Sequence, residues 1–328
     1  MVTLLRSPLQ EIRTPALDSR RWNHFEPRDD DIVIATFPKS GTTWMQRITD
    51  LLVFQSPQIR PVGKISPWLD CTFFDALEDD IARLKAQTHR RFVKSHLPFD
   101  ALPLWDNVKY IHVARDGRDA RLSWMNHQQG FRPEMRARIA SKAMALAMER
   151  DGPPAAPPPP APEAPRDFLL QWFGELEVAL NDRIEGKATA NLDYFAFEAT
   201  YWRERRRPNL LLVHYNDLKE DLEGEMWRIA EFLNIALPGS IMPALVEAAR
   251  FETMKKDGDA LNPALRTTFD RGAERFINQG LSGRWRQYLG PEDISRYDAI
   301  VQRATTPALA QWLEGGRKKA GDPKSEED

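Results

Sequence analysis

Residues 31–44 read DIVIATFPKSGTTW and hold the features that decide the fold. The apolar, β-branched run at 32–35 is typical of a buried strand. After the turn, apolar side chains in 45–52 recur at the three- and four-residue spacing of a helix. The stretch therefore predicts a buried strand, a polar turn, and a helix that begins at Thr42.

The polar turn has the chemistry of an anion-binding site. Lys39 brings a positive charge, Gly41 allows the backbone to approach a ligand closely, and Ser40, Thr42 and Thr43 bring hydroxyl donors. The helix N-terminus adds free N–H groups and a partial positive charge. We expect the turn to hold a phosphate-like group; the alternative is an ordinary strand-to-helix turn with a surface lysine.

The residue order separates this turn from a Walker A loop. That loop reads G-x-x-x-x-G-K-[ST], with its lysine after the glycine, whereas Lys39 precedes Gly41 and no glycine lies upstream in the turn. The segment P-K-S-G-T-T-W, which ends at Trp44, resembles the 5′-phosphosulfate loop of the cytosolic sulfotransferase family. The resemblance implies that residues 39–44 bind 3′-phosphoadenosine 5′-phosphosulfate (PAPS) or its product PAP.

The composition is that of an ordinary globular protein. The 328 residues are 42% hydrophobic and 29% charged, with a formal net charge of −2. So small a net charge does not attract nucleic acid, so the positive charge for an anionic ligand must be local. The single cysteine, Cys71, excludes an internal disulfide and fits a cytoplasmic location. The N-terminal residues lack the apolar core of a signal peptide, and no stretch has the apolar length of a membrane span.

Four short apolar segments alternate with helical sequence. This alternation predicts the α/β class: a single-domain, three-layer P-loop-like fold with a central parallel sheet flanked by helices. The expected strands are Asp31–Phe37, Arg91–Lys94, Lys109–Ala114 and Leu210–His214. The expected helices include Thr42–Phe54, Arg118–His127, Phe168–Asn181 and Glu225–Leu233.

The chain divides into one domain and two terminal segments. We expect an N-terminal arm over 1–30, a sulfotransferase-like domain over 31–314, and a flexible tail over 315–328. The Pro- and Ala-rich stretch 152–165 includes four consecutive prolines at 157–160. It predicts an extended insertion within the domain.

A second strand–turn–helix unit carries the next candidate residues. Arg115 follows the strand expected over 109–114, at the end where open α/β sheets place their ligands, and Ser123 follows eight residues later. A guanidinium and a hydroxyl in these positions could close on one phosphate, and either Asp116 or Asp119 is suited to cap the helix. The pattern resembles the 3′-phosphate-binding motif of the same family. Taken alone, the segment also fits a helix with surface ion pairs.

The segment 92–98, FVKSHLP, supplies candidate catalytic residues. In an extended chain, Lys94 and His96 point to the same side. A histidine is a natural general base near neutral pH, and a neighbouring lysine can stabilise charge on a departing oxygen. Similar segments in the family carry the catalytic histidine, so we expect His96 to be the base, with Lys39 at the leaving oxygen and Lys94 assisting. The other histidines are interpreted as structural: His24, His89, His112, His127 and His214.

Residues 276–285, FINQGLSGRW, resemble the C-terminal loop R-K-G-x-x-G-D-W of the family, which folds over the donor. The resemblance implies that Asn278, Gln279 and Gly280 contact the donor, although the first two replace basic residues. The loop also carries Arg284 where relatives have aspartate. A nearby arginine could restore the lost charge, and the sequence leaves four candidates open: Arg271, Arg275, Arg284 and Arg286.

Aromatic residues complete the expected site. Trp44, Tyr215 and Phe251 align with aromatic side chains near the adenine of relatives. Other aromatics either wall an apolar acceptor pocket or pack in the core, and we expect the core for at least half of them. They are Trp68, Phe73, Phe74, Phe131, Trp172, Phe173, Tyr194, Phe195, Phe197, Tyr201 and Trp202.

These features predict an enzyme that moves the sulfuryl group from PAPS to a hydroxyl of a small hydrophobic or amphiphilic acceptor, such as an alcohol, phenol or lipid. No metal is expected, because lysines supply the positive charge and no acidic cluster is spaced to hold Mg²⁺. The alternatives are a kinase- or ATPase-like phosphoryl transferase and a non-catalytic nucleotide-binding relative. The expected partner is a small molecule, without nucleic acid; the acceptor's identity and the oligomeric state stay open.

Overall fold

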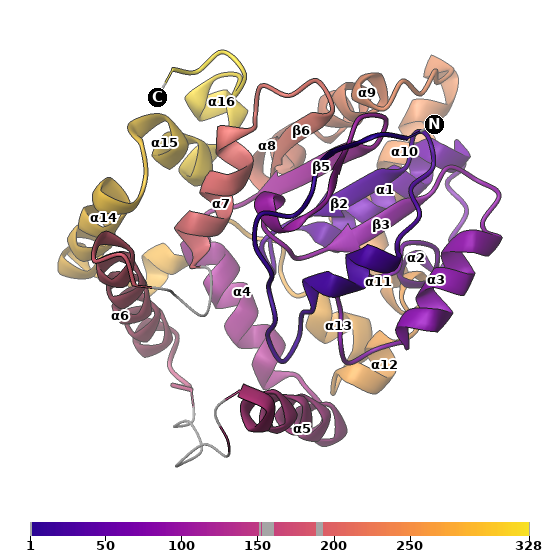
Figure 1. Ribbon diagram of the computed structural model, residues 1–328. Helices are drawn as coiled ribbons and strands as arrows, with labels where there is room; N and C mark the ends of the chain where they lie inside the picture. Colours follow the sequence, from indigo (N-terminus) through magenta and orange to yellow (C-terminus); the bar gives the residue numbers. More distant parts are fainter. Residues whose placement is uncertain (1, 151, 153–160, 188–192, 328) are drawn as a thin grey trace.

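The computed structural model describes residues 2–150, 152, 161–187 and 193–327. A four-stranded parallel sheet in the order β3-β2-β5-β6 forms its centre (Figure 1). Its strands are β2 (Ile32–Ala35), β3 (Phe92–Ser95), β5 (Lys109–Ala114) and β6 (Leu210–His214). The predicted α/β class with a central parallel sheet is confirmed.

Helices cover both faces of this sheet (Figure 1). The α-helices are α1 (Thr42–Phe54), α2 (Val62–Ile65), α3 (Leu77–Ala86), α4 (Gly117–Gln129), α5 (Pro133–Arg150), α6 (Pro165–Ile184), α7 (Tyr194–Arg203), α8 (Tyr215–Glu220), α9 (Leu222–Phe232), α10 (Met242–Ala249), α11 (Phe251–Leu261), α12 (Leu265–Thr268), α13 (Gly272–Phe276), α14 (Pro291–Ala304), α15 (Pro307–Gly315) and α16 (Arg317–Ala320). Short 3₁₀ helices are η1 (Ser19–His24), η2 (Phe99–Ala101), η3 (Gly239–Ile241) and η4 (Arg284–Gln287).

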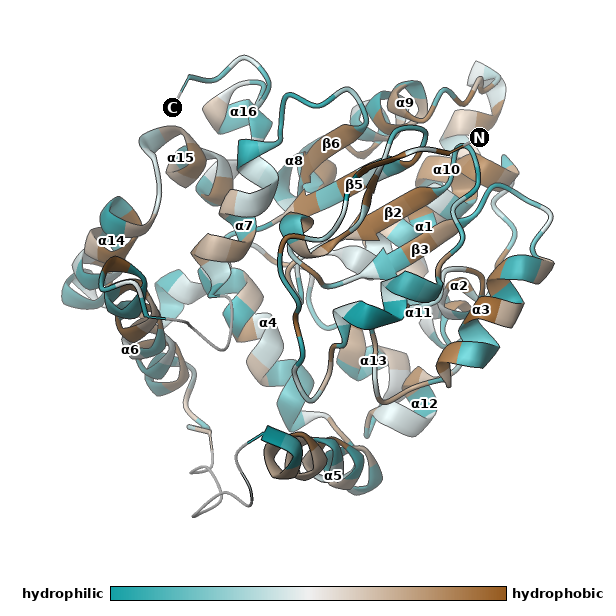
Figure 2. Ribbon diagram, viewed as in Figure 1, coloured by the Kyte–Doolittle hydropathy of each residue, from teal (hydrophilic) through white to brown (hydrophobic). Residues whose placement is uncertain are grey.

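Alternate residues of each strand pack into opposite layers. In β2, Ile32 and Ile34 join a core with α1, α9 and α10, whereas Val33 and Ala35 join a core with α4, α6 and α7. The sheet is therefore buried on both faces, and Figure 2 shows its strands as largely hydrophobic. Burial on both faces explains why each strand is a continuous apolar run in the sequence.

The register of the sheet brings three chain segments to one edge. Ala35 pairs with Ser95 of β3 on one side and with His112 of β5 on the other. The turns that follow these strands, at Thr36, His96 and Arg115, consequently lie side by side at the carboxyl edge of the sheet.

The chain outside the predicted domain packs against it. Near the N-terminus, β1 (Leu4–Arg6) pairs with β4 (Leu104–Trp105). At the other end, the segment expected to be a flexible tail forms α16. Beyond it, the carbonyls of Pro323 and Glu326 accept hydrogen bonds from Arg205. The prolines at 157–160 lie outside the described residues.

Candidate active site

The turn between β2 and α1 is sharply curved. Lys39 and Gly41 have positive φ angles of 70° and 106°, and a Cβ on Gly41 would lie 3.0 Å from the ring of Tyr215. Helix α1 has no side-chain cap, so its first N–H groups remain available to a ligand. The Ser40 hydroxyl is buried without a hydrogen-bond partner. These are the properties of a cradle for an anion.

Arg115 reaches the same turn from the neighbouring strand. Its guanidinium donates hydrogen bonds to the carbonyls of Lys39 and Leu281, both at 3.0 Å, and lies 4.2 Å from the ring centre of Tyr215. Its Nε is buried without a partner. Ser123, on α4, lines the same cavity, so the predicted pair faces one space, with an arginine donor still unused.

Asp116 and Asp119 have different roles, and the sequence left open which of the two caps α4. Asp116 caps α4 by accepting hydrogen bonds from the first N–H groups of the helix. Asp119 holds the C-terminal loop instead: its carboxylate accepts the N–H of Gly283 at 2.6 Å and that of Arg284 at 3.1 Å. The loop is thereby fixed beside the Arg115 site.

One cavity of about 620 Å³ joins these groups. It is lined by all the predicted site residues except Ser40: Lys39, Gly41, Thr42, Thr43, Trp44, Lys94, His96, Arg115, Ser123, Tyr215, Phe251, Asn278, Gln279 and Gly280. Of the aromatic residues considered for an acceptor pocket, four line this cavity: Trp68, Phe73, Phe74 and Phe131. The other seven belong to the hydrophobic core: Trp172, Phe173, Tyr194, Phe195, Phe197, Tyr201 and Trp202.

His96 has one fixed nitrogen and one that remains available. Its Nδ1 lies 2.7 Å from the carbonyl oxygen of Thr36, which can only accept, so Nδ1 carries the hydrogen and Nε2 the lone pair. Burial, aided by the charge of Lys94, holds the pKa of His96 well below its usual range. Near neutral pH the imidazole is therefore a neutral base.

Lys39 and Lys94, two of the lysines that line the cavity, lie against aromatic rings. Lys94 Nζ is 4.1 Å from the ring centre of Trp68, and the edge of Trp68 meets the His96 ring. Enclosure lowers the pKa of Lys94 to about 8. Enclosure, together with the charges of Arg115 and Lys94, lowers the pKa of Lys39 to about 7. Within the described residues, neither ammonium group forms an ion pair with a carboxylate, so both would gain from an anionic ligand.

His127, which the sequence predicted to be structural, is a further residue of this site. His127 lines the cavity, and its Nδ1 lies 3.3 Å from Lys39 Nζ. The signal that could have revealed it is its spacing from Ser123: four residues apart on one helix, the two share a face.

The structure also distinguishes the four arginines that could replace the lost basic residues. Arg271 and Arg275 are paired with Glu274 and Asp270, and Arg286 packs over Trp285. Only Arg284 of the four lines the cavity, and no ion pair to its guanidinium occurs within the described part of the chain.

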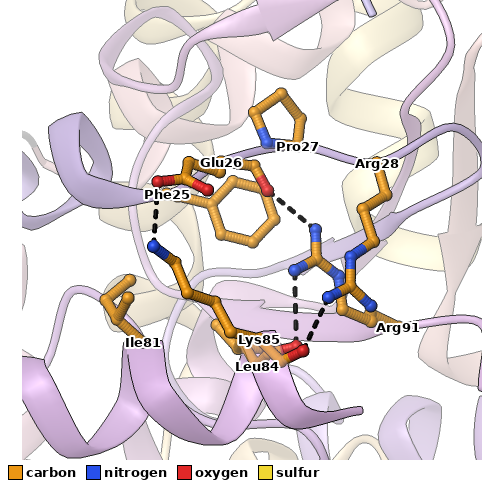
Figure 3. Close-up of a pocket in the computed structure, with 8 residues that line it drawn as sticks. All are labelled: Phe25, Glu26, Pro27, Arg28, Ile81, Leu84, Lys85 and Arg91. Atoms are coloured by element: carbon orange, nitrogen blue, oxygen red, sulfur yellow. Dashed lines mark hydrogen bonds and ion pairs between the residues drawn. The ribbon is translucent and has the colours of Figure 1, made fainter. Parts of the chain in front are cut away.

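A second, smaller hollow, drawn in Figure 3, lies beside Arg91, the residue before β3 at the amino edge of the sheet. It has a volume of about 120 Å³, and its charged groups are already paired. Arg91 binds Asp31 and the carbonyl of Glu26, while Arg28 binds the carbonyls of Gln87 and Lys85. With its donors satisfied internally, this hollow is a structural feature.

Within the described ranges, no group of three or more His, Cys, Asp or Glu side chains is placed to hold a metal ion. No helix in these ranges combines the length and hydrophobicity needed to cross a bilayer.

Comparisons with known proteins agree with this geometry. The family model for the sulfotransferase domain matches residues 29–315. A glycolipid sulfotransferase of Mycobacterium tuberculosis is 35% identical over 314 residues, covering 93% of this chain and 94% of that protein. Sulfotransferase 1B1 of Canis lupus familiaris is 26% identical over 300 residues, covering 88% of each chain. A mouse sulfotransferase crystallised with PAP shares the fold, with a TM-score of 0.58, 18% identity, and coverage of 89% and 90% of the two chains. The chain therefore belongs to the sulfotransferase family.

Proposed function

We propose that this enzyme moves the sulfuryl group of PAPS to a hydroxyl of a hydrophobic or amphiphilic acceptor. The observation that supports this most is the single cavity of about 620 Å³, which joins an anion cradle, a second cationic turn, a neutral histidine and an aromatic wall. Sulfuryl transfer itself follows from the family; the residue roles and the acceptor class are the proposal.

The polar groups left without partners fit a donor with phosphates at both ends. The turn 39–43 would bind the 5′-phosphosulfate through the first N–H groups of α1 and the Thr42 and Thr43 side chains that line the cavity. Arg115 and Ser123 would bind the 3′-phosphate, with the unpaired Arg115 Nε as an additional donor. Arg284 is placed to supply the charge that Asn278 and Gln279 lack.

The adenine would lie among three aromatic side chains at the other side of this turn. Trp44 and Tyr215 meet edge to face at 5.3 Å, and the Trp44 indole N–H is held by the carbonyl of Ala249 at 2.8 Å. Phe251 packs against the backbone of Gly280, where a Cβ would come within 2.6 Å of the ring. Flat apolar faces of this kind suit a stacked base.

The chain's own residues account for the chemistry. PAPS supplies a sulfuryl group whose transfer, like phosphoryl transfer, depends mainly on positioning and charge stabilisation. His96 would accept the acceptor's hydroxyl proton at Nε2, because Thr36 occupies Nδ1. Lys39 would stabilise the negative charge on the oxygen of the departing PAP, and Lys94 would assist from β3.

The aromatic wall supports an acceptor with a substantial apolar part. Trp68, Phe73, Phe74 and Phe131 line the same cavity as His96, and such surfaces bind apolar groups while one polar point fixes orientation. The glycolipid activity of the mycobacterial relative points to the same class. The buried single cysteine, Cys71, is consistent with the cytoplasmic location that we propose.

A single-turnover assay with radiolabelled PAPS tests this proposal. We expect transfer to long-chain alcohols, phenols and glycolipids, and little transfer to the matched free sugars. A preference for free sugars would contradict the acceptor class. PAP binding without transfer to any member of the panel would favour a non-catalytic relative, and stronger stabilisation by ATP·Mg²⁺ than by PAP would favour a phosphoryl transferase.

A further inference from the structure

His127 stands in an aromatic enclosure beside the reaction centre. Its ring stacks on Trp124 with the ring centres 5.1 Å apart, and it meets Phe131 and Phe269 in T-shaped contacts with the ring centres 4.8 Å apart. A tilted contact with Phe276 at 5.7 Å completes the enclosure. A hydrogen-bonding ring held in this way has a fixed orientation.

Lys39 enters this enclosure from the β2–α1 turn. Its Nζ lies 3.3 Å from His127 Nδ1 and 4.2 Å from the ring centre of Phe276. Within the described residues, this nitrogen is the one hydrogen-bond acceptor recorded for the Lys39 ammonium. Because an ammonium can only donate, Nδ1 of His127 must carry the lone pair in this contact.

The remaining charged neighbours of Lys39 oppose its charge. Arg115 acts on it from the turn after β5 and Lys94 from β3, both as cations. The other titratable side chains of the centre, His96 and His127, are neutral because burial lowers the pKa of each. The lone pair of His127 and the face of Phe276 are therefore the groups that favour a protonated Lys39.

We propose that His127 is a positioning residue for Lys39. Before the donor binds, His127 keeps the Lys39 ammonium charged and directed into the cavity. The inference rests on the proposed function, in which Lys39 stabilises the leaving oxygen. It gives that lysine a partner on α4, the helix that also carries Ser123, so that both ends of the donor site are arranged from one helix face.

Competitive labelling with acetic anhydride measures the pKa of Lys39 in the full chain. Peptide mass spectrometry measures the extent of Lys39 acetylation across the pH range in the wild type and in two variants. His127→Leu removes the hydrogen-bond acceptor, whereas His127→Gln keeps one. We expect His127→Leu to lower the pKa of Lys39 by about one unit and His127→Gln to stay near the wild type. The matched control is His89→Leu, because His89 packs against Phe54 and Phe92 outside the cavity.

The outcomes separate the inference from the function on which it rests. An unchanged pKa of Lys39 in His127→Leu, or equal shifts in the Leu and Gln variants, would overturn the role of His127. Thermal unfolding of each variant shows that the compared chains are folded. PAP should protect Lys39 of the wild type from acetylation; a pKa shift without such protection would support the positioning role but contradict the proposed function.

Discussion

At the residue scale, neighbouring groups set the protonation states of His96, Lys39 and Lys94. The carbonyl of Thr36 fixes the tautomer of His96, and burial keeps its imidazole neutral. Lys39 and Lys94, by contrast, have pKa values lowered to about 7 and about 8. The free site therefore loses positive charge as the pH rises through this range, whereas the imidazole of His96 is already neutral at lower pH.

Replacing His96 tests the base directly. His96→Asn should lower kcat by a factor on the order of 10²–10⁴, because proton transfer is lost, while PAP binding by calorimetry stays close to that of the wild type. The pH profile of kcat/KM gives a second check. Because the pKa of His96 lies well below 6.5, the wild-type value should not fall between about pH 7 and pH 6, and it should decline at higher pH as the lysines deprotonate. Unchanged turnover in the variant would mean that another group accepts the proton.

At the element scale, the sequence predicted what is locally encoded. The helix expected at Thr42–Phe54 has these bounds in the structure, and the four strands agree within a few residues at each end. Burial on both faces gives each parallel strand an apolar run, and the glycine turn marks the start of α1. Helix α5 was not predicted: Met144 and Met148 are about half exposed, so its apolar residues do not mark a single buried face. Figure 1 shows this helix at the edge of the molecule.

The candidate site was predictable where its residues lie within one motif. The turn at 39–43, the pair Arg115 and Ser123, and the pair Lys94 and His96 each lie on one short segment, and all line the cavity except Ser40. The contacts of His127 and Asp119 were not predictable. They depend on partners 88 and 164 residues away along the chain, which local spacing does not reveal.

Substitution of Gly41 tests whether anion binding depends on the backbone shape of the turn between β2 and α1. Its φ of 106° is strained for any residue with a Cβ, and that Cβ would lie 3.0 Å from Tyr215. We expect Gly41→Ala to weaken PAP binding at least ~10-fold by calorimetry, with about 1 kcal/mol or more lost in unfolding free energy. The control is Gly239→Ala, where nothing lies within 4 Å and the backbone is ordinary. Equal PAP affinities in the two variants would show that the cradle does not depend on this turn.

At the scale of the whole molecule, the strand order creates the site. Because β2 and β5 are neighbours, the turn at Lys39 and the turn at Arg115 come together, and the hydrogen bond from Arg115 to Leu281 adds a loop from 166 residues further along the chain. We propose that these two turns bind opposite ends of one adenylate-derived donor.

The most direct test compares, by calorimetry, the affinities of the protein for PAP and for adenosine 5′-phosphate, because the two ligands differ only in the 3′-phosphate. A bidentate, charge-assisted contact from Arg115 predicts that the wild type binds PAP at least ~10²-fold more tightly. This preference should largely disappear in Arg115→Leu, while affinity for adenosine 5′-phosphate changes little. Equal affinities of the wild type for the two ligands would contradict the account.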